Sequence, residues 1–162
     1  DDIGISTALV TNQEMRAWEI SMNELLLAAR ENTPRLFPAH MIDMEEMIQK
    51  AGIHVPEDES SIPMYIMTNQ QEVNGASVLL YDNVLERFAQ RKKTDFYILP
   101  SSIHEVILVP SDRIDDPSLL FTMVEDANNT VVALGDILSD SVYYYSRRKN
   151  QIIPVKEGRK IM

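Results

Sequence analysis

The chain has 162 residues and a net charge of −10, and 44% of its residues are hydrophobic, which is typical of a single soluble domain. It contains no cysteine, so disulfides, zinc–thiolate sites, iron–sulfur clusters and a cysteine nucleophile are excluded. No apolar run approaches the roughly 18 residues of a membrane span, and no signal-like stretch opens the chain. We therefore expect residues 1–162 to form one cytoplasmic domain.

The charge is unevenly distributed along the chain. Residues 1–140 carry 24 acidic and 9 basic side chains, whereas residues 141–162 carry six basic side chains and one acidic one. An acidic body repels nucleic acid and anionic lipid, because both are densely negative. The basic terminal segment is interpreted either as a contact site or as a solvated end that folds over its own acidic body.

The N-terminal third is predicted to be mainly helical. Residues 3–10 are β-branched and apolar, and predict a short strand. Two capping boxes, in which Ser or Thr precedes Glu by three residues, begin at Thr11 and Ser21. The first predicts a helix ending near Trp18, and the second a helix ended by Pro34, because the residue before proline avoids helical geometry.

A third helix is predicted from Asp43 to Ala51, with Gly52 just beyond its end. Residues 53–61 are acidic and predict a loop. The triplet His40, Asp43 and Glu46 has metal-like spacing, but on a helical wheel Glu46 lies about 120° from His40. Metal ligands must converge, so we predict neither a metal site nor a cofactor.

The second half of the chain changes to a strand-like pattern. Two hairpins are predicted, with strands over residues 62–69 and 76–81 and over residues 96–99 and 103–109. Helices follow at Asp82 and Asp116, and a last hairpin spans residues 142–155. This order predicts an α+β fold, with an antiparallel or mixed sheet built from hairpins, helices packed on one side of it, and a helical N-terminal half.

The segment with the most catalytic groups comprises Ser101, Ser102, His104 and Glu105. A serine activated by histidine is a common nucleophile. In a strand, however, Ser102 and His104 share one face and Glu105 points to the other, so Glu105 cannot orient His104. The alternative is that the serines form the hairpin turn and His104 is a half-buried strand residue. We therefore assign no catalytic residue, and an enzyme is the less favoured interpretation.

The C-terminal strand interleaves aromatic and basic residues, as single-strand nucleic-acid surfaces do. The candidate binding residues are Tyr143, Tyr145, Arg147, Arg148 and Lys149. Two tyrosines at most can stack from one face of a strand, and the acidic body disfavours nucleic acid. Tyrosines that pack their rings in a sheet are the alternative interpretation.

Four segments together resemble a known family. They are Met64 to Asn69, Asn74 to Ala76 with Leu80-Tyr81, Val84 to Glu86, and the run from Tyr97 to Val106, which contains Leu-Pro-Ser-Ser-Ile-His-Glu. They resemble a family of bacterial domains of unknown function from gut-dwelling Gram-positive bacteria, and more distantly YtpQ-like proteins. The resemblance covers about residues 5–150 and implies no activity. It implies that this chain is the C-terminal region of a longer protein, which fits a first residue that is not Met.

Three functions follow from these observations. The favoured one is a cytoplasmic, non-enzymatic interaction or regulatory module with a protein partner that the sequence does not identify. The first alternative is a small hydrolase-like enzyme that uses Ser102 and His104. The second is weak binding of single-stranded nucleic acid through the tyrosine and arginine residues of the C-terminal strand.

Overall fold

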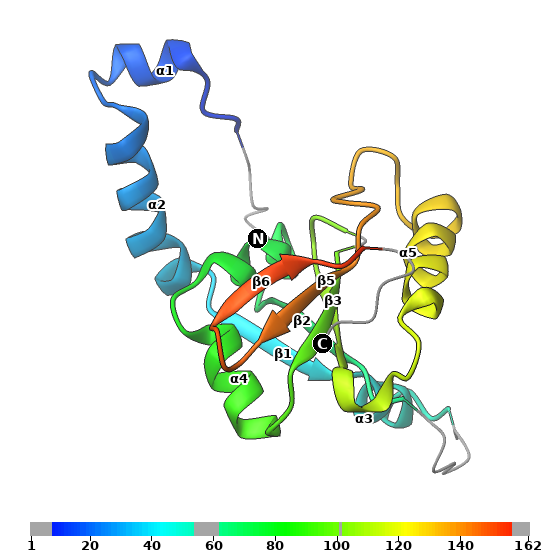
Figure 1. Ribbon diagram of the computed structural model, residues 1–162. Coiled ribbons are helices and arrows are strands. Elements are labelled where there is room, and N and C mark those ends of the chain that lie inside the picture. Colours follow the sequence, from blue (N-terminus) through cyan, green and yellow to red (C-terminus); the bar gives the residue numbers. More distant parts are fainter. Residues whose placement is uncertain (1–7, 54–61, 101, 157–162) are drawn as a thin grey trace. The chain divides into compact units, whose positions relative to one another are not determined.

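The computed structural model describes residues 8–53, 62–100 and 102–156, and the chain divides into two compact units. The first unit lies within Asp1–Leu36 and is helical, whereas the second lies within Phe37–Met162 and contains the sheet (Figure 1). Most of the strand predicted over residues 3–10 lies outside the described residues, and residues 8–10 form no strand. Within the described residues, no helix is both long and apolar enough to cross a bilayer.

The helical unit contains α1 (Asn12–Ala17) and α2 (Met22–Leu36). Both predicted capping boxes are confirmed. The Thr11 hydroxyl accepts a hydrogen bond from the backbone N–H of Gln13 at 3.1 Å, and Glu24 accepts one from the backbone N–H of Ser21 at 2.8 Å. No residue of either helix is buried, so these helices depend on local interactions.

The end predicted for α2 at Pro34 is wrong, because the helix continues through the proline to Leu36. Proline has no backbone N–H and so removes one hydrogen bond from a helix. Pro34 lies in the last turn of α2, where only Arg35 and Leu36 follow it, so the helix ends soon after this loss. The side chain of Arg35 donates a hydrogen bond to Asn32 at 3.0 Å within this last turn.

The second unit is built on a six-stranded antiparallel sheet with the order β1-β2-β4-β3-β5-β6. The strands are β1 (Ala39–Asp43), β2 (Tyr65–Asn69), β3 (Phe96–Leu99), β4 (Val106–Pro110), β5 (Tyr143–Ser146) and β6 (Gln151–Pro154). The antiparallel pairing of the predicted hairpins β3–β4 and β5–β6 is confirmed. The strand predicted over residues 103–109 begins only at Val106, so Ser102 and His104 precede β4 and the strand alternation expected for them does not apply. The antiparallel sheet with its helices confirms the α+β class.

The helical elements of this unit are α3 (Met44–Lys50), the 3-10 helix η1 (Gly75–Leu80), α4 (Val84–Lys92), the 3-10 helix η2 (Ser111–Arg113) and α5 (Ser118–Thr130). The strand predicted over residues 76–81 is therefore wrong, and the hairpin over 62–81 does not form. Instead β2 pairs with β1 on one side and with β4 on the other. The predicted helices at Asp43 and Asp116 are confirmed, whereas α4 begins one residue later than predicted, after Asn83.

Helices cover both faces of the sheet, which corrects the expectation that they pack on one side (Figure 1). Phe96 and Ile98 of β3 belong to one core cluster together with Phe88 of α4. The intervening Tyr97 and Leu99 belong to a second cluster that contains Leu120 and Val124 of α5. Since successive side chains of a strand point to opposite faces, an unbroken apolar run requires cover on both.

The strand β1 was not predicted, and it changes how His40 is placed. His40 lies in β1 and Asp43 is the N-cap of α3, where its carboxylate accepts a hydrogen bond from the Glu45 N–H at 3.1 Å. The helical wheel used for His40 and Glu46 therefore does not apply. Within the described residues, no group of three or more His, Asp or Glu side chains is placed to hold a metal ion.

Candidate functional site

Segments from three parts of the chain meet around His104. The closest approach is at Gly75, where a Cβ atom would overlap the Thr68 hydroxyl and the His104 carbonyl oxygen. The buried Thr68 hydroxyl donates a hydrogen bond to that carbonyl at 2.7 Å, and the Ala76 N–H donates one to the Ile103 carbonyl at 3.1 Å. Only glycine fits at position 75, and its absent side chain lets η1 pack directly on the chain entering β4.

The ring of His104 is held at both nitrogens. Its Nδ1 accepts a hydrogen bond from the backbone N–H of Asn74 at 3.2 Å, and its Nε2 lies 3.7 Å from a carboxylate oxygen of Asp136. A neutral imidazole has one donor and one acceptor nitrogen, so acceptance at Nδ1 places the proton on Nε2, towards Asp136. Neither nitrogen is then available to take a proton from a serine hydroxyl.

The serine hydroxyl of the predicted catalytic segment has a backbone partner. Ser102 is buried, and its Oγ accepts a hydrogen bond from the His104 N–H at 2.9 Å, as in a serine turn. Ser101 lies outside the described residues, and Glu105 is half-buried. The Ile103 N–H donates to the Asp136 carbonyl at 2.8 Å. We name this assembly of residues 68–76, 102–104 and 136 the His104 cluster; its hydrogen bonds position backbone, and catalysis by Ser102 and His104 stays a prediction.

An apolar cleft of about 390 Å³ opens beside the His104 cluster. It is lined by Asn74, Ala76, Ser77, Leu79, Leu80, Ile103 and Leu138. Leu80 and Leu138 are 77% and 44% exposed, so the rim of the cleft presents hydrocarbon to water. The residues that line this cleft come from η1, the loop before β4 and the loop before β5, which the His104 cluster holds together.

The C-terminal hairpin carries a second set of polar contacts, centred on Asp95. The Tyr144 hydroxyl donates to the Asp95 carboxylate at 2.9 Å, and Arg147 Nε lies 3.0 Å from the other carboxylate oxygen. Burial raises the pKa of the Asp95 carboxyl, but the hydrogen bonds from Tyr144 and Arg147 outweigh it and leave that pKa below its ordinary value. Burial, and then the bond to Asp95, raise the pKa of Tyr144.

The five candidate nucleic-acid residues do not share one free surface. The ring of Tyr145 is buried in the sheet core, and its hydroxyl donates to Asn150 at 2.8 Å. Tyr143 packs against the same core cluster, and Arg147 is paired with Asp95. Arg148 and Lys149 are exposed in the turn. Stacking by these tyrosines therefore has little support in the geometry, and nucleic-acid binding stays a prediction.

The model of a family of unknown function, DUF5688, matches residues 1–147 of the chain. The chain belongs to DUF5688. No curated protein and no solved structure matches it. The family match confirms the resemblance to an uncharacterised family, whereas the relation to YtpQ-like proteins stays a prediction.

The DUF5688 match ends at Arg147, the residue that pairs with Asp95. It therefore includes the helical unit, the His104 cluster and both partners of the Asp95 ion pair. The match does not include β6. The His104 cluster and the contacts of Asp95 with Tyr144 and Arg147 therefore lie within the residues that match DUF5688.

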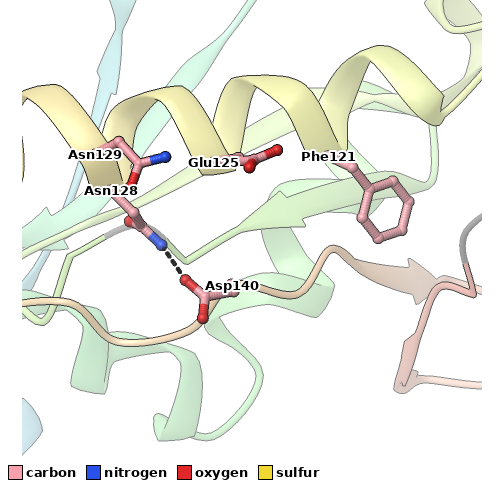
Figure 2. Close-up of a pocket in the computed structure, with 5 residues that line it drawn as sticks. All are labelled: Phe121, Glu125, Asn128, Asn129 and Asp140. Carbon is pink, nitrogen blue, oxygen red and sulfur yellow. Dashed lines mark hydrogen bonds between the residues drawn. The ribbon is translucent and has the colours of Figure 1, made fainter.

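A polar pocket of about 380 Å³ lies between α5 and the loop that precedes β5 (Figure 2). It is lined by Phe121, Glu125, Asn128, Asn129 and Asp140. The Asn128 amide donates to the Asp140 carboxylate at 2.7 Å and to the Ser139 carbonyl at 3.2 Å. These bonds tie the loop to α5, so this side chain contributes to the structure of the DUF5688 sheet unit.

Three important residues escaped the sequence analysis. Asp95 and Asp136 are acidic residues in an acidic chain, so composition gives them no distinguishing signal. Their partners, Arg147 and His104, are 52 and 32 positions away, and long-range pairs of this kind leave no local pattern. Leu138 lies next to Ile137 in a loop that also contains Val131 and Leu134, and an apolar run does not by itself show which of its side chains are exposed.

Proposed function

We propose that this DUF5688 chain is a non-enzymatic interaction module of the cytoplasm, in which the apolar cleft beside the His104 cluster receives a protein partner. The observation that carries the proposal is the exposure of Leu80 and Leu138 on the rim of that cleft. Apolar side chains gathered around a concave surface favour association, because covering them removes hydrocarbon from water.

The polar groups next to the cleft support binding over catalysis. His104 uses Nδ1 to accept from Asn74, and Ser102 uses its hydroxyl to accept from the backbone of His104. Both groups therefore fix the shape of the cleft wall. A wall of hydrogen-bonded backbone keeps apolar side chains in place and lowers the entropy lost when a partner binds.

The loop that carries Leu138 also exposes other apolar side chains. Val131 and Leu134 precede it and are 81% and 92% exposed. A soluble chain rarely concentrates aliphatic side chains in one loop without a partner for them. We therefore expect the loop over residues 131–138 to contribute to the interface.

Site-specific photocrosslinking in the native host tests the proposal. A photoreactive phenylalanine analogue is placed at Leu80 in the full-length protein. The control position is Leu119 of α5, which is also more than half exposed and does not line the cleft. We expect a discrete protein adduct from position 80 that is absent from position 119, and that is lost when Leu138→Asp is added. Identical adducts from both positions, or none from position 80, would contradict the proposal.

A further inference from the structure

The strand β1 forms one edge of the sheet and is a second, separate surface. Among the described residues it pairs only with β2, in the register that sets His40 opposite Thr68 and Ile42 opposite Ile66. An edge strand carries a row of backbone donors and acceptors that point away from the sheet. Such a row can pair with any extended chain of suitable chemistry.

The hydrogen bonds that flank β1 show which of its residues face outward. The Gln70 N–H donates to the Pro38 carbonyl, and the Met44 N–H donates to the Met64 carbonyl, both at 3.0 Å. In an antiparallel pair, residues that bond to the neighbouring strand alternate with residues that do not. The backbone groups of His40 and Ile42 therefore bond to β2, while those of Ala39 and Met41 and the N–H of Asp43 point to the open edge. The carbonyl of Asp43, the N-cap residue, belongs to the first turn of α3.

A groove of about 310 Å³ runs along this strand. Its wall includes four successive residues of β1, from His40 to Asp43, and the residues of α3 that follow the strand. Met47 of α3 is 42% exposed in it and supplies an apolar contact. A strand edge on one side and a helix on the other form the arrangement in which an extended peptide can add to a sheet.

The charges around the groove select the peptide. Asp43, Glu46 and Glu72 line it, and the one cation among the lining residues that is permanently charged is Lys50, which is paired with Glu46 at 3.5 Å. The excess negative charge disfavours a second copy of this acidic chain at the edge. It favours a segment with lysine or arginine at alternate positions, since alternation puts all of its cations on one face.

We propose that β1 binds an extended basic peptide, which adds to the sheet as a further antiparallel or parallel strand and places its cations against Asp43, Glu46 and Glu72. Backbone pairing with Ala39, with Met41 and with the N–H of Asp43 supplies the binding, and the acidic groove supplies the selectivity. This surface is separate from the apolar cleft, so its test can fail without affecting the proposed function.

The probe is a capped peptide of about eight residues that alternates lysine with valine, matched to the length of natural strands. Binding of this peptide to the full chain is followed by amide hydrogen exchange of the protein. On binding, we expect slower exchange at Met41, which faces the edge, and unchanged exchange at His40 and Ile42, which already pair with β2. A peptide of the same length that alternates glutamate with valine is expected to bind at least about tenfold more weakly at low salt.

Two variants with equal charge changes separate the groove from the rest of the surface. The double substitution Glu46→Gln with Glu72→Gln is expected to weaken binding of the lysine–valine peptide by about tenfold at low salt. The control, Glu45→Gln with Glu125→Gln, removes two exposed carboxylates that do not line the groove and leaves the affinity unchanged. N-methylation removes the backbone N–H of a residue. We expect methylation of every second peptide residue to abolish binding when the methylated residues are those that pair with β1, and not when they are the residues in between.

The proposal is overturned by any of three results. The first is equal loss of affinity in both double variants, which indicates a diffuse charge effect. The second is protection at Ala76 or Ile103 in place of Met41, which locates the peptide in the apolar cleft. The third is protection of Met41 that depends on protein concentration without peptide, which identifies a second copy as the occupant.

Discussion

The helical unit and the sheet unit of this chain are stabilised in opposite ways. In α1 and α2 no residue is buried, and the clearest stabilising contacts are capping boxes between residues three apart. In the sheet unit, β3 and β4 are buried on both faces, and key bonds join residues tens of positions apart. The comparison shows that a helix can be specified locally without a core, whereas this sheet depends on distant contacts.

The helical unit still carries apolar residues at helical spacing. Met22, Leu26 and Leu36 lie along α2, and each is more than half exposed. A helix of 15 residues is near the lower limit for stability alone in water. Its caps therefore have a large influence on whether it forms, and the sheet unit has no comparable dependence on a single local contact.

The strongest test of this difference is Gly75→Ala. The added methyl group overlaps the Thr68 hydroxyl and the His104 carbonyl and lies 2.9 Å from the Asn69 nitrogen, so backbone must shift. We expect the free energy of unfolding of the sheet unit to fall by about 3 kcal/mol. Chemical denaturation followed by tyrosine fluorescence measures this change.

The control is Gly135→Ala, the same chemical change at a glycine where the added Cβ has no neighbour within 4 Å. We expect it to alter the stability by no more than about 0.5 kcal/mol. Equal losses of stability at the two glycines would show that the effect comes from the lower backbone flexibility of alanine, and not from the packing of the His104 cluster.

A smaller effect is expected from Asp95→Asn, which removes the carboxylate bound by Tyr144 and Arg147. At neutral pH we expect a loss of about 1–2 kcal/mol. Because the pKa of Asp95 is lowered on folding from its ordinary value of 3.8, its contribution is fully present above that value. It is lost as the pH falls from that value through the lower pKa of the folded state.

The stability difference between the wild type and Asp95→Asn should therefore shrink as the pH is lowered below about 4. Parallel denaturation series at several pH values measure it, and the difference cancels the titration of the other carboxyls. A difference that stays constant at acid pH would show that shape, and not charge, makes residue 95 important.

The smallest effect on the sheet is expected from Ser21→Ala in the helical unit. It removes the hydroxyl that accepts from the Glu24 N–H at 3.3 Å and donates to its carboxylate at 2.7 Å. We expect less helix signal from α2, and a change of less than about 0.5 kcal/mol in the unfolding of the sheet unit. Amide chemical shifts report both units in one sample, and Ser77→Ala is a comparison outside α2. Equal loss of order in both units would contradict the expectation that the effect of Ser21→Ala is confined to α2.

The same contrast explains what the sequence could predict. The helices at Thr11, Ser21 and Asp43 begin where capping residues predicted, because a cap acts within one turn. The pairing of β3 with β4 was also predicted, since two apolar runs flank a Pro-Ser-Ser turn signal, although the connection in the structure is longer and spans residues 100–105. Local signals therefore gave the α+β class and most helix starts.

The errors lie where distant residues decide the structure. Residues 76–80 are apolar enough for a strand, but packing of Gly75 on His104 winds them into η1. The strand β1 follows directly after α2 and is only five residues long, and its pairing with β2 has no local mark. The cover on both faces was readable in principle, because Phe96 to Leu99 is apolar without interruption.

The candidate site was predictable only in part. The segment around His104 was singled out by its functional groups, and the structure makes it the centre of a hydrogen-bonded cluster. What the sequence could not give was the role of each atom. The bond from His104 to Ser102 joins residues two apart, as in a serine turn, but the bond from Asn74 to Nδ1 depends on how η1 packs and joins residues 30 positions apart.

The packing of Gly75 also bears on the chemical ageing of this protein. An asparagine followed by glycine is the sequence most prone to deamidation, in which the side-chain amide carbon is attacked by the next backbone nitrogen. That attack requires rotation about the backbone of the asparagine. Asn74 adopts φ 50° and ψ 31°, its N–H is bound to His104, and the Gly75 backbone packs closely against Thr68 and His104. The fold therefore restrains an asparagine that in an unfolded chain can cyclise with loss of ammonia, giving an imide that water opens to a mixture of aspartate and isoaspartate.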